Sequence, residues 1–127
     1  MFEKLEITAM AQAMASHAGA RLGAISQNMA NADTPGYKAR DVADFASVWE
    51  AGHGGAMRST RSGHLGGNAQ TMTAVVISGS GAAAPNGNSV SLEGEMVKAV
   101  EVRQQHDMAL AIYRNTSAIV RASLGRR

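Results

Sequence analysis

The sequence feature that most constrains the fold is an apolar pattern over residues 91–124 that repeats every seven residues. Its members follow one another at alternating spacings of four and three, as on a helix that packs against another helix. At 1.5 Å per residue such a helix is about 50 Å long. A chain of 127 residues cannot cover that much apolar length by itself, so we expect a coiled coil that neighbouring subunits complete. The positions of this seam are Leu92, Met96, Ala99, Arg103, His106, Leu110, Tyr113, Ser117, Val120 and Leu124.

Both ends of this predicted helix contain end signals. Ser91 fits the N-cap position, and Glu93 and Glu95 suit the positive end of the helix dipole. Gly125 is placed to end the helix. The capping residues and the seven-residue pattern therefore predict the same helix.

A second helical pattern occupies residues 2–30. Gly19 and Gly23 each weaken this helix by about 1 kcal/mol relative to Ala. They are either simply tolerated or leave a shallow groove for another helix. His17 lies beside the apolar stripe, and we expect it to pack rather than to bind a ligand. The stripe consists of Ile7, Met10, Met14, Ala18, Leu22, Ile25 and Met29.

Residues 28–40 join this first helix to the rest of the chain. Asn31 is a poor residue for a helix interior because its side chain competes for nearby backbone groups. Pro35 keeps Thr34 out of the helical region of backbone space. Pro35 and Gly36 suit the centre of a type II turn, in which Gly36 has a positive φ. Local chemistry alone favours a helix end followed by a rigid turn over a ligand-binding loop.

The middle of the chain, residues 32–90, is rich in glycine and has weaker patterns. Residues 71–77 have the β-branched composition of a strand, which could form a hairpin with residues 57–60. Residues 78–88 have the composition of a flexible connector. A short helix with two aromatic anchors is also predicted, although a loop with the same anchors fits nearly as well. Its recurring apolar positions are Val42, Phe45, Val48 and Trp49.

The predicted fold class is mainly α. Long N- and C-terminal helices form a coiled-coil-like bundle, and the Gly-rich middle contains a short helix and a possible small β-hairpin. Residues 1–31 and 91–127 are expected to form one structural domain, with residues 32–90 as a turn, loop and irregular or β region.

Composition excludes several classes of function. The 12 basic and 10 acidic residues leave a net charge of +2, which is too balanced to argue for nucleic-acid binding. The absence of cysteine excludes disulfides and a cysteine nucleophile. The four histidines lack metal-site spacing, and no serine lies in a nucleophile-elbow pattern. We therefore expect no enzyme activity, cofactor, metal or small-molecule substrate. We also expect no membrane span, because the longest strongly apolar run is residues 75–77.

Two stretches near opposite ends of the chain match the pattern of a known family. The first is Asn28-x-x-Asn31-x-x-Thr34-Pro35-Gly36-Tyr37-Lys38, and the second is Asn86-Gly87-Asn88-Ser89-Val90-Ser91-Leu92-Glu93-Gly94-Glu95-Met96. Both resemble the flagellar basal-body rod proteins, and Asp41 and Asp44-Phe45 after the first stretch favour their proximal members. The chain departs from the family pattern at Val102 and His106, where Asn and Tyr are usual.

The resemblance implies a structural subunit of the proximal rod, which polymerises through its terminal helices as part of the drive shaft. Its implied partners are copies of itself, other flagellar rod proteins, and the basal-body base and export-gate proteins. The resemblance also implies a periplasmic rod location reached by flagellar type III export without a cleaved signal peptide. Composition alone predicts a cytoplasmic protein, because no secretory signal is visible. A cytoplasmic coiled-coil adaptor or flagellar export chaperone is the alternative.

Two sets of residues are therefore expected to direct assembly. The assembly motif comprises Asn28, Asn31, Thr34, Pro35, Gly36, Tyr37 and Lys38. The helix-seam set combines positions from the stripe of residues 2–30 with positions from the seam of residues 91–124. It comprises Met14, Leu22, Ile25, Leu92, Met96, Leu110, Tyr113 and Val120.

Overall fold

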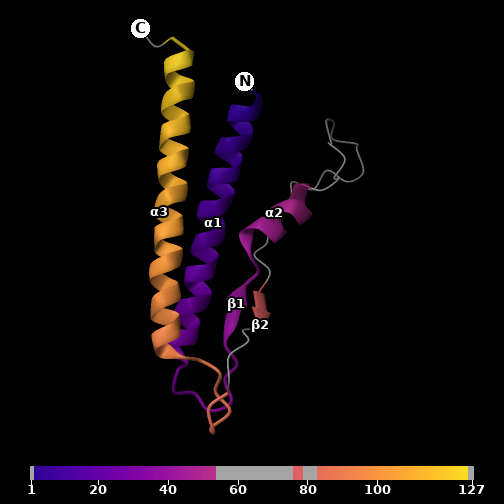
Figure 1. The fold of residues 1–127 in the computed structure, drawn as a ribbon, viewed down its shortest axis with the longest axis vertical. Coiled ribbons are helices and arrows are strands. Elements are labelled where there is room, and N and C mark those ends of the chain that lie inside the picture. The colour runs from indigo at the N-terminus through magenta and orange to yellow at the C-terminus, as the bar shows by residue number, and fades with distance from the viewer. Residues whose placement is uncertain (1, 54–75, 79–82, 126–127) are drawn as a thin grey trace.

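The computed structural model describes residues 2–53, 76–78 and 83–125. In these ranges the chain is mainly helical, as predicted, and Figure 1 shows α1 and α3 side by side as an antiparallel pair. Helix α1 begins and α3 ends at the same end of this pair, while the connecting segments gather at the other end (Figure 1). The elements in chain order are α1 (Phe2–Ala30), β1 (Arg40–Val42), α2 (Phe45–His53), β2 (Val76–Ser78) and α3 (Leu92–Ser123).

The predicted ends of α3 are confirmed. The Ser91 side-chain oxygen accepts a hydrogen bond from the Gly94 amide at 3.3 Å, which satisfies one of the free N–H groups of the first turn. Glu93 lies in that turn, where its charge suits the helix dipole. Gly125 follows the helix at a φ of 63°, which is the left-handed conformation expected of a terminating glycine.

The core of the helix pair lies between α1 and α3, close to the connecting segments. Ala18 and Ile25 of α1 pack with Val102 of α3, and all three side chains are at most 2 % exposed. Burying a side chain the size of Ile25 or Val102 stabilises the fold by about 1.5–3 kcal/mol. Ala11 and Ala109 are also buried, and their small side chains allow the two helices to approach closely. The partly buried neighbours of this core are Leu22, Met29 and Ala99.

The side of α3 that faces α1 coincides only in part with the predicted seam. Val102 and Ala109 are fully buried, although neither was included in the seam. Ala99 and His106 are half-buried and belong to both sets. Among the other seam positions, Leu92, Met96 and Tyr113 are exposed, and Leu110 and Val120 are half-buried.

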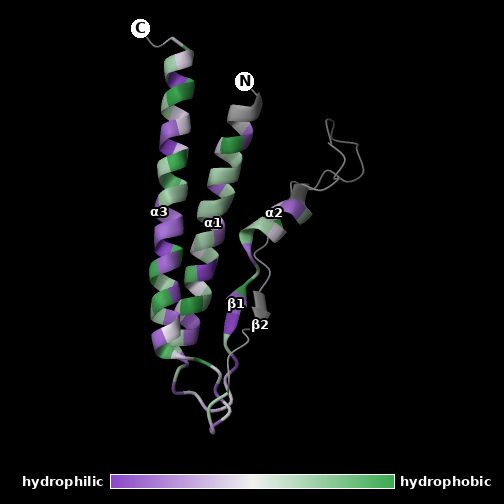
Figure 2. Ribbon diagram, in the orientation of Figure 1, coloured by the Kyte–Doolittle hydropathy of each residue, from purple (hydrophilic) through white to green (hydrophobic). Residues whose placement is uncertain are grey.

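The difference has a physical cause. Figure 2 shows apolar residues along the whole of α3, interspersed with polar ones rather than confined to one narrow stripe. Val102 and Arg103 lie three and four residues after Ala99, so both fit the helical period, and Ala109 and Leu110 follow them seven residues later. The spacing alone therefore does not choose between the two stripes. The fit against α1 chooses the smaller residues Val102 and Ala109.

The middle of the chain packs along α1. Strand β1 pairs antiparallel with β2, so that Asp41 lies opposite Ile77. Val42 is 4 % exposed, and β1 contacts α1. The predicted strand is described only from Val76 onward, and its predicted partner, residues 57–60, lies outside the described residues. The partner that the structure describes, β1, was not predicted from the sequence.

Helix α2 confirms the predicted short helix and is anchored by its aromatic residues. The Phe45 and His17 rings meet edge-on, with their centroids 5.5 Å apart. The Nε2 atom of His17 donates a hydrogen bond of 2.7 Å to the Ala43 carbonyl oxygen. The Trp49 ring lies 5.7 Å from that of Phe45. His17 thus packs against the middle segment, as expected. None of the helices in the described ranges is both long and apolar enough to cross a membrane.

Candidate functional site

The turn after α1 has the predicted geometry. The Thr34 carbonyl accepts a hydrogen bond from the Tyr37 amide at 3.3 Å, which closes the turn around Pro35 and Gly36. Gly36 has a φ of 73°, the value required at the third position of a type II turn. The chain therefore leaves α1 in a direction set by this turn.

Asn28, near the end of α1, is fully buried and uses its whole hydrogen-bonding capacity. Its Nδ2 donates to the Arg40 carbonyl at 2.6 Å and to Oε2 of Glu95 at 3.0 Å. Its Oδ1 accepts from the Arg40 amide at 2.9 Å and from the Tyr37 hydroxyl at 3.4 Å. A carboxamide has two donors and an acceptor oxygen with two lone pairs, and every one is used here. Asn28 thus links α1, the turn and α3.

Asn88 closes the end of α1 from a distant part of the chain. Its Nδ2 donates toward the carbonyl oxygens of Asn31, Ala32 and Thr34, at 3.0, 2.7 and 2.9 Å respectively. Carbonyls at and just beyond a helix C-terminus have no partner inside the helix. The Oδ1 atom of Asn88 accepts from the Val90 amide at 2.7 Å, so the side chain is fixed at both ends.

Backbone contacts hold the two family-like stretches together as one joint. The Gly36 amide donates to the Asn86 carbonyl, and the Ser89 amide donates to the Tyr37 carbonyl, both at 3.0 Å. Gly87 has a φ of 80°, and a Cβ atom there would lie 3.4 Å from the Gly36 Cα. The two glycine turns therefore lie against each other. We refer to residues 28–40 and 86–95 as the joint.

Charged side chains surround the joint on the side of β1. Glu95 is 3 % exposed and, besides Asn28, receives a hydrogen bond of 2.9 Å from Lys98. Asp41 accepts two hydrogen bonds from the Arg21 guanidinium, at 3.0 and 3.3 Å. Lys98 Nζ also lies 3.8 Å from Asp41. Each of the two carboxylates is therefore paired with at least one cation or amide donor, as partly buried charges require.

This pairing shifts the titration of Asp41 and Arg21. Burial alone raises the pKa of Asp41, but hydrogen bonds from Arg21 and the Val42 amide, with the charges of Arg21 and Lys98, outweigh burial and lower it. The hydrogen bond to Asp41 is the main cause that raises the pKa of Arg21, against the opposite effect of burial. Both groups therefore stay ionised at neutral pH.

All seven residues of the predicted assembly motif lie at the joint. Thr34 donates its hydroxyl to Oδ1 of Asn31 at 3.2 Å, and Lys38 donates to the Gly87 carbonyl at 3.2 Å. The seam residues do not gather here, because they are spread along both helices. Sequence reasoning gave no role to Asn88 and assigned Glu95 only to the helix dipole, although both lie in the second family-like stretch. The match to the family pattern was the one signal that pointed to these two residues. The spacing of residues in the sequence could not show which part of the chain they contact.

Comparison with known proteins adds one relative. No protein-family model matches the chain. The flagellar basal body rod protein FlgB of Agrobacterium fabrum is 27 % identical over 118 residues, which cover 89 % of this chain and 88 % of that protein. An aligned part of that extent includes both halves of the joint. The joint and this end-to-end similarity together support the flagellar basal-body rod protein family for the chain.

Proposed function

We propose that this chain is a structural subunit of the proximal part of the flagellar rod, where it assembles through its terminal helices as part of the drive shaft. The similarity to FlgB supports a component of the basal-body rod. The observation that supports assembly is the contrast between a fully hydrogen-bonded joint and the apolar surface of the helices that extend from it. The joint fixes the angle between the helices, and the surface is available to neighbours.

Large apolar side chains are exposed on both helices of the pair, as on surfaces that contact other proteins. On α1, Ile7 is 42 % exposed and Met10 is 38 % exposed. Large apolar residues are exposed along the whole length of α3. In its last turns no described residue is buried. The exposed apolar residues of α3 are Leu92, Met96, Val97, Val100, Met108, Ile112, Tyr113, Ile119 and Leu124. Packing of these residues on other subunits would remove them from water, at about 25 cal/mol per Å² of apolar surface.

The proposed partners are copies of this chain, other rod proteins, and the proteins of the basal-body base and export gate. Different patches on neighbouring copies would meet in each contact, and such contacts extend into a helical array instead of closing into a ring. The proposed location is the periplasmic rod, reached by the flagellar export route without a cleaved signal peptide. The role is structural, with no catalytic step.

The joint gives this proposal a mechanical basis. Asn28 and Asn88 tie the end of α1 to the start of α3, so a load applied along one helix passes to the other through buried hydrogen bonds. Because buried polar groups are costly to leave unpaired, the joint resists opening. A subunit of a rotating shaft needs this resistance.

The test is fractionation of cells that make the chain. We expect an epitope-tagged chain to purify with intact basal bodies and to remain with the rod after the membrane is dissolved by detergent. A tagged cytoplasmic enzyme is the control for carry-over. A chain found only in the soluble cytoplasmic pool would support the adaptor or chaperone and contradict the rod subunit.

A further inference from the structure

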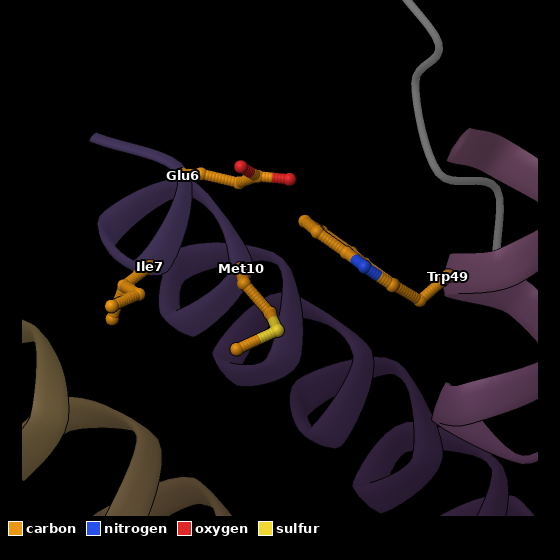
Figure 3. A pocket seen from close by; sticks show the side chains of 4 residues that line it. All are labelled: Glu6, Ile7, Met10 and Trp49. Atoms are coloured by element: carbon orange, nitrogen blue, oxygen red, sulfur yellow. The ribbon is translucent and has the colours of Figure 1, made fainter. Parts of the chain in front are cut away.

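An open groove lies between α1 and α3. Its volume is about 510 Å³, compared with about 270 Å³ for the hollow between α1 and α2 that Figure 3 shows. Leu22 lines the groove from α1, and the other lining residues belong to α3. They are Ala99, Val100, Arg103, His106 and Asp107. The groove therefore combines apolar side chains with two opposite charges.

The two charged residues, Arg103 and Asp107, lie one helical turn apart, and both are exposed. Among the residues that the structure describes, Arg103 forms no ion pair. Asp107 lies 3.7 Å from Nδ1 of His106, and 71 % of its side chain is exposed. Both charges can therefore interact with another molecule.

Arg103 and Asp107 belong to a row of positions on α3 whose spacings alternate between four and three. Such a row follows one side of a helix and is the pattern that packs against a second helix. Val100 is 70 % exposed and Met96 is 50 % exposed, so α1 does not cover this side of α3. We refer to these positions as the groove row. It consists of Met96, Val100, Arg103, Asp107, Leu110 and Arg114.

The groove row is complementary to itself when a second copy runs in the opposite direction. An antiparallel α3 presents the row in reverse order, so Arg103 of each copy meets Asp107 of the other, and an arginine can bind a carboxylate through two nitrogens. In the same alignment Val100 lies level with Leu110 of the second copy. A parallel alignment in register would instead place like charges against each other. The charges and the apolar residues therefore select the same antiparallel alignment.

We propose that two copies of this chain associate through the groove row as a two-fold symmetric pair of antiparallel α3 helices. A two-fold contact uses the same surface on both copies, so two copies complete it. It thus differs from the contacts of a growing rod and belongs to the chain before assembly. The pair covers Leu110, one of the residues expected to direct assembly, so a copy leaves the pair when it joins the rod.

Cysteine cross-linking locates the contact, because the chain has no cysteine of its own. Gln104 and Gln105 are neighbouring exposed glutamines near the centre of the proposed pair. At about 100° per residue, Gln104 lies beside the groove row and Gln105 lies on the opposite side of α3. Purified Gln104→Cys and Gln105→Cys chains are treated with a short bis-maleimide. We expect the Gln104→Cys chain to link to a second copy and the Gln105→Cys chain to stay single, and equal linking overturns the inference.

Charge reversal tests the alignment through sedimentation equilibrium of purified chains. We expect Arg103→Asp and Asp107→Arg each to weaken the pair about tenfold, because each variant replaces two ion pairs by two contacts between like charges. An equimolar mixture of the two variants should associate like the wild type, since each mixed pair again places carboxylates against guanidinium groups. An ion pair within one helix cannot explain this rescue. Glu101→Arg, at an exposed position outside the groove, is the control and should associate normally.

Circular dichroism of each variant checks that the helices still form. A wild-type chain that remains monomeric at about 1 mM overturns the inference, as does a mixture that associates no more tightly than either variant alone. Neither result alters the proposed function, which is tested separately by the presence of the chain in basal bodies.

Discussion

The side-chain amide of Asn28 on α1 donates a hydrogen bond of 3.0 Å to the carboxylate of Glu95 on α3, and both side chains are almost completely buried. The two residues are 67 positions apart in the chain. Each belongs to one of the two stretches that resemble the rod protein family. Their contact is the point at which those stretches become a single structural unit.

Removal of the Asn28 amide should therefore destabilise the monomer strongly. Asn28→Ala removes the hydrogen bond to Oε2 of Glu95 and both hydrogen bonds to the Arg40 backbone, which we expect to cost about 3 kcal/mol. Urea unfolding followed by circular dichroism measures the loss. The neighbouring exposed residue gives the control, and Gln27→Ala should change stability by no more than about 0.5 kcal/mol. Similar losses for both variants would show that Asn28 does not hold the joint.

Two glycines should respond to substitution with opposite signs. Gly36 has a φ of 73°, so Gly36→Val forces a β-branched residue into a strained conformation, at a cost of about 1–3 kcal/mol. Gly23 lies within α1 with nothing within 4 Å of its absent Cβ, so Gly23→Ala should stabilise the monomer by up to about 1 kcal/mol. Thermal unfolding compares the two. Gly81 belongs to the connector predicted over residues 78–88 and lies outside the described residues.

Acid should weaken the contact between β1 and the helices. The folded-state pKa of Asp41 is lowered below the ordinary value of 3.8, so its contribution is fully present above that value and is lost as the pH falls through the lowered pKa. Asp41→Asn should remove about 1 kcal/mol at pH 7 and much less in strong acid, because the wild-type carboxyl is then protonated as well. Urea midpoints at several pH values measure this. The control is Asp33→Asn, at an exposed position of the turn, which should change the urea midpoint little at pH 7.

Charges introduced on α3 should separate folding from assembly. Val102 is fully buried against α1, so Val102→Asp should unfold the helix pair at a cost of several kcal/mol. Leu110 and Val120 are half-buried, and Leu110→Asp or Val120→Asp should abolish rod assembly while export continues. Swimming and secreted chain are measured in each strain. Gln104→Asp, on an exposed polar position, is the control, and normal swimming in both seam variants would exclude the seam as a subunit interface.

Order in the isolated monomer should decline along α3 away from the joint. Val102 and Ala109 are buried, whereas the last turns contain exposed Ile119 and Leu124 and have no buried residue. We expect slow amide hydrogen exchange between residues 95 and 109 and fast exchange after residue 112. Uniform strong protection to the end of α3 in a verified monomer would contradict the idea that neighbours complete these helices.

Local features of this fold were predictable from the sequence because they depend on neighbours along the chain. The extent of α1 and α3, the Ser91 cap and the positive φ of Gly36 each follow from residues within a few positions. Backbone propensity, capping and turn chemistry act at that range. The family resemblance was also visible in the sequence, because it is a match of residue patterns.

The tertiary structure alone decided which distant groups meet. Three contacts link segments that are far apart in the sequence, and the sequence spacing does not predict any of them. They are the hydrogen bond of Asn28 with Glu95, the closure of α1 by Asn88 and the pairing of β1 with β2. The tertiary structure also decided that Val102 and Ala109, not the neighbouring seam positions, face α1. Periodicity identifies the faces that a helix can bury, but the shape and unpaired polar groups of the partner determine which face is buried.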